Sequence, residues 1–350
     1  MHPQPGSEDL PWGKPFSIDL ILKVLNTTFF HPFVAWMVPL CMRAQAMPWH
    51  HTAIQVSIGY AAFLTLIYFC QILNLRIAYS RPRKVDLSKE VIVITGGASG
   101  LGLLIAEVYG MRGATVAVLD TEDLEAGELR GVTAYRCDVG DKDRLAKVAL
   151  EIERDLGTPT ILINNAAIVN GKPLLDLSMA EIENCVRTNL LSHFYTIKTF
   201  LPSMVRAGSG TIVTISSVLS SLGSASLSDY TATKAGITAM HKSLTAELKS
   251  IPNIKTVLVS PGQIGSSLFN EVKTPNSFFG PVLESVDVAM EIIATIDSGA
   301  SASLAMPLYA RWADWMNVMP VGVQSILRRL TGIDTAMKTY KRLDRTQDTK

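Results

Sequence analysis

Three side chains in the third quarter of the chain have types and a spacing suited to proton transfer. Tyr230 and Lys234 lie four residues apart in a segment predicted to be helical, so their side chains share one face. A lysine ammonium beside a phenol stabilises the phenolate and lowers the tyrosine pKa from its usual value of about 10. Ser217, thirteen residues before Tyr230, ends a predicted strand and could hold a substrate oxygen beside the phenol. The pattern predicts a tyrosine that exchanges a proton near neutral pH.

The segment Thr95 to Gly102 (TGGASGLG) has the composition of a phosphate-binding turn. It follows a short apolar run, Val91–Thr95, and opens the predicted helix Leu101–Arg112. Glycine permits a tight turn and a close approach of the backbone to a pyrophosphate, and the start of a helix offers free N–H groups and a positive dipole. A glycine cluster alone indicates only a turn. Its position between a strand and a helix predicts a dinucleotide site.

Asp120 ends the second predicted strand, eighteen residues after Gly102. A carboxylate at this position can accept hydrogen bonds from both hydroxyls of a nucleotide ribose, and it would repel a 2′-phosphate. Thr121, Glu122 and Asp123 follow it, so no basic side chain comes next in the sequence. Asp120 therefore favours NAD over NADP; the alternative is a solvated aspartate that begins a turn.

Short apolar runs alternate with amphipathic stretches from Lys89 onward, which predicts an α/β fold with a doubly wound, mostly parallel sheet. Runs such as VIVIT and TIVTIS suit strands that are buried on both faces. The predicted strands are Val91–Thr95, Thr115–Leu119, Thr133–Cys137, Thr160–Asn164, Thr211–Ser216 and Lys255–Ser260, and the predicted helices are Leu101–Arg112, Lys142–Leu156, Met179–Leu201 and Tyr230–Ser250.

Taken together, these motifs resemble those of the short-chain dehydrogenase/reductase family over about Ser88–Ser298. The turn TGGASGLG is similar to that family's TGxxxGxG, and Asn164–Ala167 resembles its NNAG with an alanine in place of the glycine. Asp138-Val139 looks like its adenine-contacting motif. Pro261-Gly262-Gln263-Ile264 with Ser266 resembles its PGxI-x-T segment, in which the serine keeps the hydroxyl of the threonine.

The resemblance implies a catalytic tetrad of Asn189, Ser217, Tyr230 and Lys234. Tyr230 would transfer the proton, Lys234 would also bind the nicotinamide ribose, Ser217 would position the substrate oxygen, and Asn189 would order a water for proton relay. It implies a Rossmann-like sheet of about seven strands, with the last at Ser303–Pro307. The cofactor-binding residues would be Thr95, Gly96, Ser99, Gly100, Leu101, Gly102, Asp120, Asp138, Val139, Asn165, Ala166, Tyr230, Lys234, Pro261, Gly262, Ile264 and Ser266.

Residues 1–87 form a predicted membrane-anchoring region. Residues 52–75 carry no charge and suffice to cross about 30 Å of hydrocarbon as a helix. Arg76, Arg81, Arg83 and Lys84 follow, and by the positive-inside rule they place the next domain in the cytosol. A second apolar stretch, residues 18–42, either spans the membrane or lies in its interface with Trp12 and other aromatic residues.

The composition agrees with membrane attachment. Hydrophobic residues make up 48% of the 350 residues, and the mean hydropathy of +0.25 is high for a soluble protein. The net charge of +1 gives no electrostatic reason for nucleic acid as a partner. The four cysteines are scattered without metal-binding or disulfide spacing, and no metal site is expected.

Two apolar segments bear on the substrate. Beyond the catalytic region, Leu268, Phe269, Val272, Phe278, Phe279 and Val282 suit either a pocket for a lipophilic substrate or a lid that packs on its own core. The tail, residues 306–350, follows the domain at 88–305. It contains Trp312 and Trp315 and ends its apolar part at Arg328 and Arg329. It reads as a segment that seeks the membrane interface, or as a helix that docks on the domain or a second subunit.

The sequence thus predicts a hydride transfer between a nicotinamide cofactor and a lipophilic alcohol or carbonyl. Within the family, the anchored architecture resembles retinol dehydrogenases and 17β-hydroxysteroid dehydrogenases of the endoplasmic reticulum and lipid droplets. Two alternatives remain: an NADP-dependent reductase of 3-oxoacyl chains or ketones, and a membrane scaffold that binds dinucleotide without catalysis. By analogy with the family, a homodimer would pair through Met179–Leu201 and Tyr230–Ser250.

Overall fold

The computed structural model describes residues 17–269, 272, 278 and 280–340. Two compact units make up the chain: Met1–Ala78 with Ser277–Pro281, and Tyr79–Asn276 with Val282–Lys350. Trp12 and Phe279, which the sequence interpretation included, lie outside the described residues.

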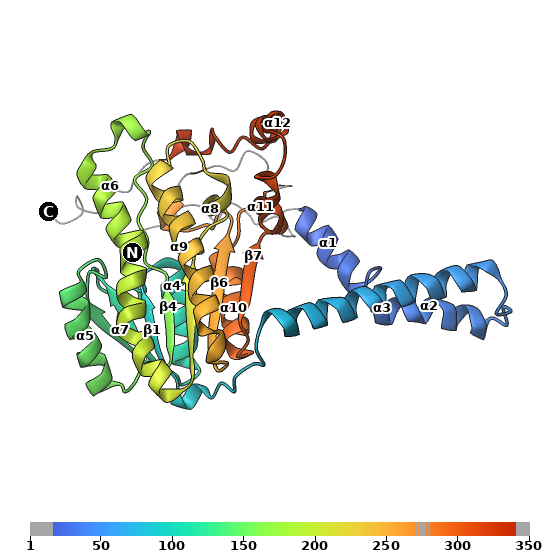
Figure 1. Ribbon diagram of the computed structural model, residues 1–350, viewed down its shortest axis with the longest axis horizontal. Helices are drawn as coiled ribbons and strands as arrows, with labels where there is room; N and C mark the ends of the chain where they lie inside the picture. The colour runs from blue at the N-terminus through green and yellow to red at the C-terminus, as the bar shows by residue number, and fades with distance from the viewer. Residues whose placement is uncertain (1–16, 270–271, 273–277, 279, 341–350) are drawn as a thin grey trace, which may run out of the picture. The chain divides into compact units, whose positions relative to one another are not determined.

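The second unit is built on one parallel sheet of seven strands in the order β3-β2-β1-β4-β5-β6-β7 (Figure 1). This confirms the predicted doubly wound α/β fold. The chain starts at the centre with β1, moves outward to β3, and then crosses back to β4, so β1 and β4 are neighbours whose connections leave in opposite directions. Such a switch point is where ligands bind in open α/β sheets. The strands are Val91–Thr95, Thr115–Asp120, Val132–Arg136, Ile161–Asn164, Gly210–Ile215, Ile254–Pro261 and Ala302–Met306, for β1 to β7.

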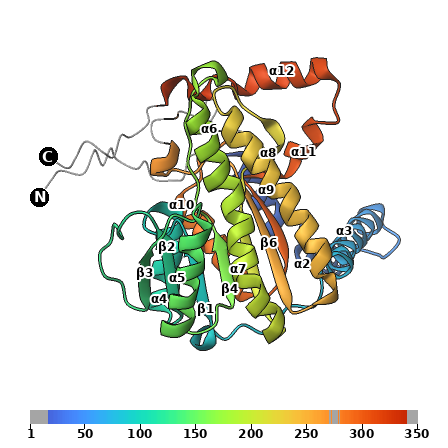
Figure 2. The ribbon, with the colours of Figure 1, turned by 60° about the vertical axis from the view of Figure 1, so that its left-hand side comes forward.

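Helices cover both faces of this sheet (Figure 2). On β1, Ile92 and Ile94 join a core with α4 and α10, whereas Val93 joins a second core with α5, α7 and α9. Alternate side chains of one strand therefore enter different apolar layers, which is why the run VIVIT contains no polar residue before its end. The helices are α4 Gly100–Met111, α5 Lys142–Asp155, α6 Met179–Val186, α7 Ser192–Ala207, α9 Ser228–Glu247 and α10 Ser285–Asp297.

The predicted helical stretch Met179–Leu201 is helical throughout and continues to Ala207, but its middle is not an α-helix. A π-helical turn, Arg187–Leu191, separates α6 from α7. One residue more per turn shifts the register of the side chains, and such bulges occur frequently at functional sites. Asn189 lies inside this turn and is fully buried. Sequence periodicity does not distinguish a single wide turn from an ordinary one.

The first unit contains three helices: α1 Ile18–Thr27, α2 Pro32–Ala44 and α3 Thr52–Ala78. Within it, α2 and α3 pack through Ala35, Ala61 and Leu64, and the indole N–H of Trp36 donates to the Thr65 hydroxyl (3.0 Å). By length and composition α3 could cross a membrane by itself. α1 and α2, bent by 52°, pass the same test only as a pair.

The chain enters the second unit through a fixed basic residue. Arg83 is buried, donates to Glu90 (2.8 Å between Nη1 and Oε1), and donates through Nε to the Thr211 hydroxyl (2.8 Å). Arg83 is therefore fixed in the second unit, whereas Arg76 in the last turn of α3 and Arg81 and Lys84 after that helix are exposed.

The remaining described elements are short and lie mostly after the last strand. The C-terminal segment leaves β7, forms α11 and α12, and returns toward the carboxyl ends of the strands (Figure 1). These short elements are α8 Leu219–Leu222, α11 Ala313–Met316 and α12 Val321–Thr331, with 3-10 turns at Leu87–Lys89, Leu174–Asp176, Leu248–Ser250, Ser267–Phe269, Leu308–Trp312 and Ala336–Thr339.

Candidate active site

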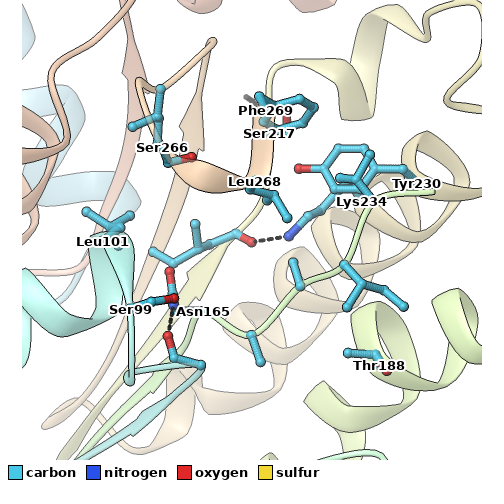
Figure 3. Close-up of a pocket in the computed structure, with 18 of the residues that line it drawn as sticks. Ser99, Leu101, Asn165, Thr188, Ser217, Tyr230, Lys234, Ser266, Leu268 and Phe269 are labelled. Atoms are coloured by element: carbon cyan, nitrogen blue, oxygen red, sulfur yellow. Dashed lines mark hydrogen bonds between the residues drawn. The ribbon is translucent and has the colours of Figure 1, made fainter. Parts of the chain in front are cut away.

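A cavity of about 560 Å³ opens at the carboxyl ends of the central strands (Figure 3). Its lining contains the predicted site residues Gly96, Ser99, Gly100, Leu101, Asp120, Asp138, Val139, Asn165, Ala166, Ser217, Tyr230, Lys234, Pro261, Gly262, Ile264 and Ser266. Residues separated by up to 170 positions in the sequence thus meet at one place. Three predicted residues, Thr95, Gly102 and Asn189, are not among those that line the cavity.

Tyr230 and Lys234 project from the first turns of α9 and are 3% and 2% exposed. The Lys234 ammonium lies 5.6 Å from the centroid of the Tyr230 ring and donates a hydrogen bond to the Ile215 carbonyl at the end of β5 (2.9 Å). The Tyr230 hydroxyl points into the cavity on the side where Ser217 lies (Figure 3). A proton donor, a cation and a hydroxyl therefore share one wall.

Burial decides the ionisation of this pair. Loss of solvent raises the pKa of Tyr230, and the hydrogen bond with Ser217 opposes this only in part. In this arrangement the ammonium of Lys234 is turned toward the Ile215 carbonyl, and burial is the largest influence on the Tyr230 pKa, so the lowering that the sequence predicts for a lysine beside the phenol is not seen. Burial also lowers the pKa of Lys234, to about 8. At neutral pH the phenol is protonated and the lysine is mostly charged.

The glycine turn is shaped by backbone conformation and by lack of space. Gly96 and Gly100 have φ values of +63° and +56°, which glycine adopts without the steric penalty of other residues. Gly102 has another reason: a Cβ there would lie 2.4 Å from the Gly96 carbonyl oxygen and 2.8 Å from Asn165 Nδ2. Gly102 therefore allows α4 to begin directly against the turn.

Two side chains lock this turn to the end of β4. The Asn165 amide donates to the Gly96 carbonyl (2.7 Å). The Thr95 hydroxyl accepts the backbone N–H groups of Asn165 (3.0 Å) and Ala166 (3.1 Å). Thr95 thus holds the site from behind and does not line it. The backbone N–H groups at the start of α4 are left facing the cavity, an arrangement that fits a pyrophosphate.

Asp120 lies on the cavity wall at the end of β2, beside the glycine turn. Its carboxylate accepts the backbone N–H groups of Ala98 (2.9 Å) and Thr121 (2.8 Å), which fixes its orientation. Among the described residues that line the cavity, Lys234 is the only lysine or arginine. The Asp120 carboxylate is an acceptor of the kind that can bind ribose hydroxyls.

The side chain of Asn189 lies behind the cavity wall, and its part in a proton relay stays a prediction. Its side chain accepts the backbone N–H of Ile168 (2.8 Å) and donates to the carbonyl of the same residue (2.9 Å). Asn189 thereby fixes the chain that follows β4. Its side chain supports the cavity through Ile168, which lines it, and donates to the hydroxyl of Thr233 (3.4 Å), which in turn donates to the backbone carbonyl of Tyr230 (2.7 Å).

An apolar wall covers Tyr230. Phe269 meets its ring edge to face (5.7 Å between centroids, 86°), and Val169, Leu227 and Met337 pack with it. Leu268, Val272 and Tyr340 contribute to the same cluster, and Tyr340 also lines the cavity.

Met337, Tyr340 and Val169 were not predicted as site residues. No motif marks Met337 and Tyr340, because the tail returns to the site from about 100 residues along the chain, and Val169 lies just beyond the motif Asn164–Ala167. Of the apolar segment predicted for the substrate, Leu268 and Phe269 line the cavity, whereas Val282 does not and Phe278 belongs to the first unit.

Comparisons with known proteins agree with this geometry. The family model described as short chain dehydrogenase matches residues 90–277. An uncharacterized oxidoreductase of Saccharomyces cerevisiae is 30% identical over 71% of this chain and 84% of its own length. Short-chain dehydrogenase/reductase 3 of Homo sapiens is 30% identical over 74% and 89%, and human retinol dehydrogenase 10 is 32% identical over 54% and 66%.

Two solved structures have the same fold. Aldohexose dehydrogenase of Thermoplasma acidophilum has a TM-score of 0.56 at 22% identity and covers 63% of this chain and 93% of its own. A short-chain dehydrogenase of Streptomyces avermitilis has a TM-score of 0.58 at 24% identity, covering 69% and 97%. At such identities the likeness concerns the arrangement of the sheet and helices alone.

Proposed function

This chain belongs to the short-chain dehydrogenase/reductase family and is an NAD(P)-dependent oxidoreductase, and we propose that it oxidises a lipophilic alcohol with NAD or reduces the corresponding carbonyl. The observation that carries the proposal is the burial of the Tyr230 hydroxyl under an apolar wall while it still points into the cavity. A phenol in this setting can exchange a proton with a substrate oxygen that is shielded from water.

A bound nicotinamide dinucleotide would supply the hydride donor or acceptor. The residues present fit such a group. The start of α4 would hold the pyrophosphate, Asp120 the adenine-side ribose, and Lys234 the nicotinamide ribose. Ser266 and Ile264 would face the nicotinamide end, since both line the cavity beside Pro261. Asp120, with no basic side chain near it in the lining, supports NAD over NADP.

Tyr230 moves the proton at the substrate oxygen. In the reductive direction its neutral hydroxyl donates; in the oxidative direction the phenolate accepts. Ser217 holds the same oxygen, and its hydrogen bond lowers the cost of forming the phenolate. Lys234, charged below about pH 8, provides a positive charge close to Tyr230. Asn189 keeps Ile168 and the adjoining wall in position.

The apolar wall around Tyr230 supports a lipophilic substrate. Leu268, Phe269, Met337 and Tyr340 present apolar and aromatic surface around the reacting hydroxyl. Burying such surface against a hydrocarbon chain or ring favours binding by about 25 cal/mol per Å². The similarity to retinol dehydrogenase 10 supports a lipophilic alcohol of this kind.

We also propose that α3 anchors the protein in a membrane. Its length and composition, the exposed Arg76 in its last turn, and the exposed Arg81 and Lys84 beyond it support a span with the catalytic domain on the cytosolic side. A lipophilic substrate would then be concentrated in the same membrane that holds the enzyme.

The test is an NADH fluorescence assay on the full-length protein in detergent, with NAD or NADP and a panel of alcohols that includes retinoids, steroids, long-chain alcohols and short water-soluble ones. We expect NADH to form with one lipophilic class and NADPH to form far more slowly. Preferred turnover of NADPH with 3-oxoacyl substrates would favour the reductase alternative. Dinucleotide binding without any turnover would favour the scaffold.

A further inference from the structure

Helix α12 docks on the domain by its polar edge. Arg328 donates to the carbonyls of Leu222 (2.6 Å) and Gly223 (3.4 Å) and forms an ion pair with Asp334. These contacts hold the helix against the end of α8. They use the side of α12 that carries its arginine, and the apolar side is turned the other way.

The apolar residues of α12 face outward. Val323, Ile326 and Leu330 follow one another at spacings of three and four, so they form a stripe on one face of the helix. Ile326 is 61% exposed and Leu330 is 73% exposed. A surface helix ordinarily buries such a stripe against its own domain, and a water-facing stripe of large aliphatic residues indicates another apolar environment.

The segment before α12 has the same character. Trp312, Trp315 and Val318 are all exposed, and the two tryptophan rings lie 6.3 Å apart. Tryptophan is enriched where a protein meets the headgroup region of a bilayer, because its ring is apolar and its N–H is polar. We call these exposed side chains the C-terminal apolar surface: Trp312, Trp315, Val318, Val323, Ile326 and Leu330.

We propose that the C-terminal apolar surface docks on the surface of the lipid bilayer. The proposal rests on the membrane anchoring by α3 that is part of the proposed function. The second unit begins at Tyr79, directly after α3, and Arg83 fixes the chain to the domain five residues after α3 ends. An extended chain of that length reaches at most about 18 Å, so the tether limits how far the domain can move from its anchor without selecting which face of the domain meets the lipid.

Charge favours lipid over a second copy of the chain. Residues 306–350 contain eight basic and four acidic side chains. A basic excess is attracted to anionic headgroups of the cytosolic leaflet, whereas two such segments would repel each other. Arg311 and Arg329 are exposed within the same stretch and suit the headgroup layer.

The same segment reaches the active site. Seven residues after Leu330, Met337 packs against Tyr230. A docked α12 would therefore bring the apolar wall of the cavity close to the membrane in which a lipophilic alcohol dissolves. The substrate would pass to Tyr230 along a short apolar path.

The test uses full-length protein in liposomes of phosphatidylcholine and phosphatidylserine. Cys41 and Cys70, the exposed cysteines among the described residues, are replaced by serine. One environment-sensitive fluorophore is then attached at Ile326→Cys, Leu330→Cys, Ser325→Cys or Phe69→Cys. Ser325 is exposed on another side of α12 and is the matched control; Phe69 reports on α3.

Nitroxides on the lipid acyl chains should quench the labels at 326 and 330 at least about twofold more than the label at 325, as expected for insertion of roughly 5–10 Å. Equal quenching at 325, 326 and 330 with strong quenching at 69 would overturn the docking and leave the anchor intact. If the labels at 326 and 330 become shielded from water as the protein concentration rises, but lipid nitroxides do not quench them, the C-terminal apolar surface contacts a second copy of the chain. Absence of quenching at 69 would refute the anchor and the docking together.

Discussion

Gly102→Ala should weaken dinucleotide binding because α4 begins too close to the turn for a methyl group. The new Cβ would lie 2.4 Å from the Gly96 oxygen, where about 3.5 Å is comfortable, so the turn must move by about 1 Å. Overpacking of this kind costs about 1–3 kcal/mol. The shift also disturbs the hydrogen bond from Asn165 to Gly96, worth about 1 kcal/mol. If binding requires the native turn, the NADH dissociation constant should rise at least roughly thirtyfold, for ~2 kcal/mol.

Gly110→Ala is the matched control at the other end of the same helix. Its Cβ would lie 2.3 Å from the Arg130 oxygen, an overlap of the same size that is remote from the cavity. Both variants should melt at lower temperature than the wild type, but only Gly102→Ala should lose affinity in an NADH fluorescence titration. Normal affinity in Gly102→Ala would refute the reasoning. An equal loss of NADH affinity in both variants would show that the effect of Gly102→Ala comes from a general loss of stability.

Three further changes test other parts of the site. Asp120→Asn keeps a hydrogen-bond acceptor but removes the charge; the ratio of kcat/KM for NAD over NADP should fall at least about tenfold, and an unchanged ratio would exclude Asp120 as the discriminating group. Tyr340→Ala opens the wall beside Gly171, so KM should rise several-fold for long apolar alcohols and little for short ones; equal effects on both would argue against a wall that selects substrate. Burial lowers the pKa of His193 from 6.5 to about 3, so the unfolded chain gains a proton first as pH falls. Stability from this residue is complete above about pH 6.5 and is lost toward pH 3, and His193→Gln should therefore show a smaller fall in Tm between pH 7 and pH 5.

The sequence was sufficient to predict the helices and strands that leave a local hydrophobic pattern. The run at β1 and most boundaries of the amphipathic stretches matched the structure to within three residues, because apolar strands buried on two faces and helices with one apolar side leave a clear periodic pattern. The exception is α7, which continues six residues beyond the predicted end at Leu201. The π-helical turn at Arg187–Leu191 was missed, since it adds a residue without changing the composition of the helix. The burial of Arg83 was missed as well, because its partner Thr211 is distant in the sequence.

The candidate site divides in the same way. Tyr230, Lys234, Ser217 and the glycine turn carry motifs, and they meet in one cavity. Met337 and Tyr340 carry none: their place depends on how the tail folds back, which Arg328 fixes through long-range hydrogen bonds. The direction of the Tyr230 pKa shift also required the structure, because the fraction of the ring that is buried cannot be read from the spacing of a tyrosine and a lysine.

The most direct test of the central claim is single-turnover hydride transfer in Tyr230→Phe, followed by NADH fluorescence with the best alcohol from the panel. The phenyl ring keeps the packing with Phe269 and Met337 and removes only the hydroxyl. The rate should fall by about 10²–10⁴, the usual contribution of a general acid or base, while the affinity for NADH stays within about twofold. Transfer at the wild-type rate would show that Tyr230 does not move the proton, and the proposed chemistry would then be wrong.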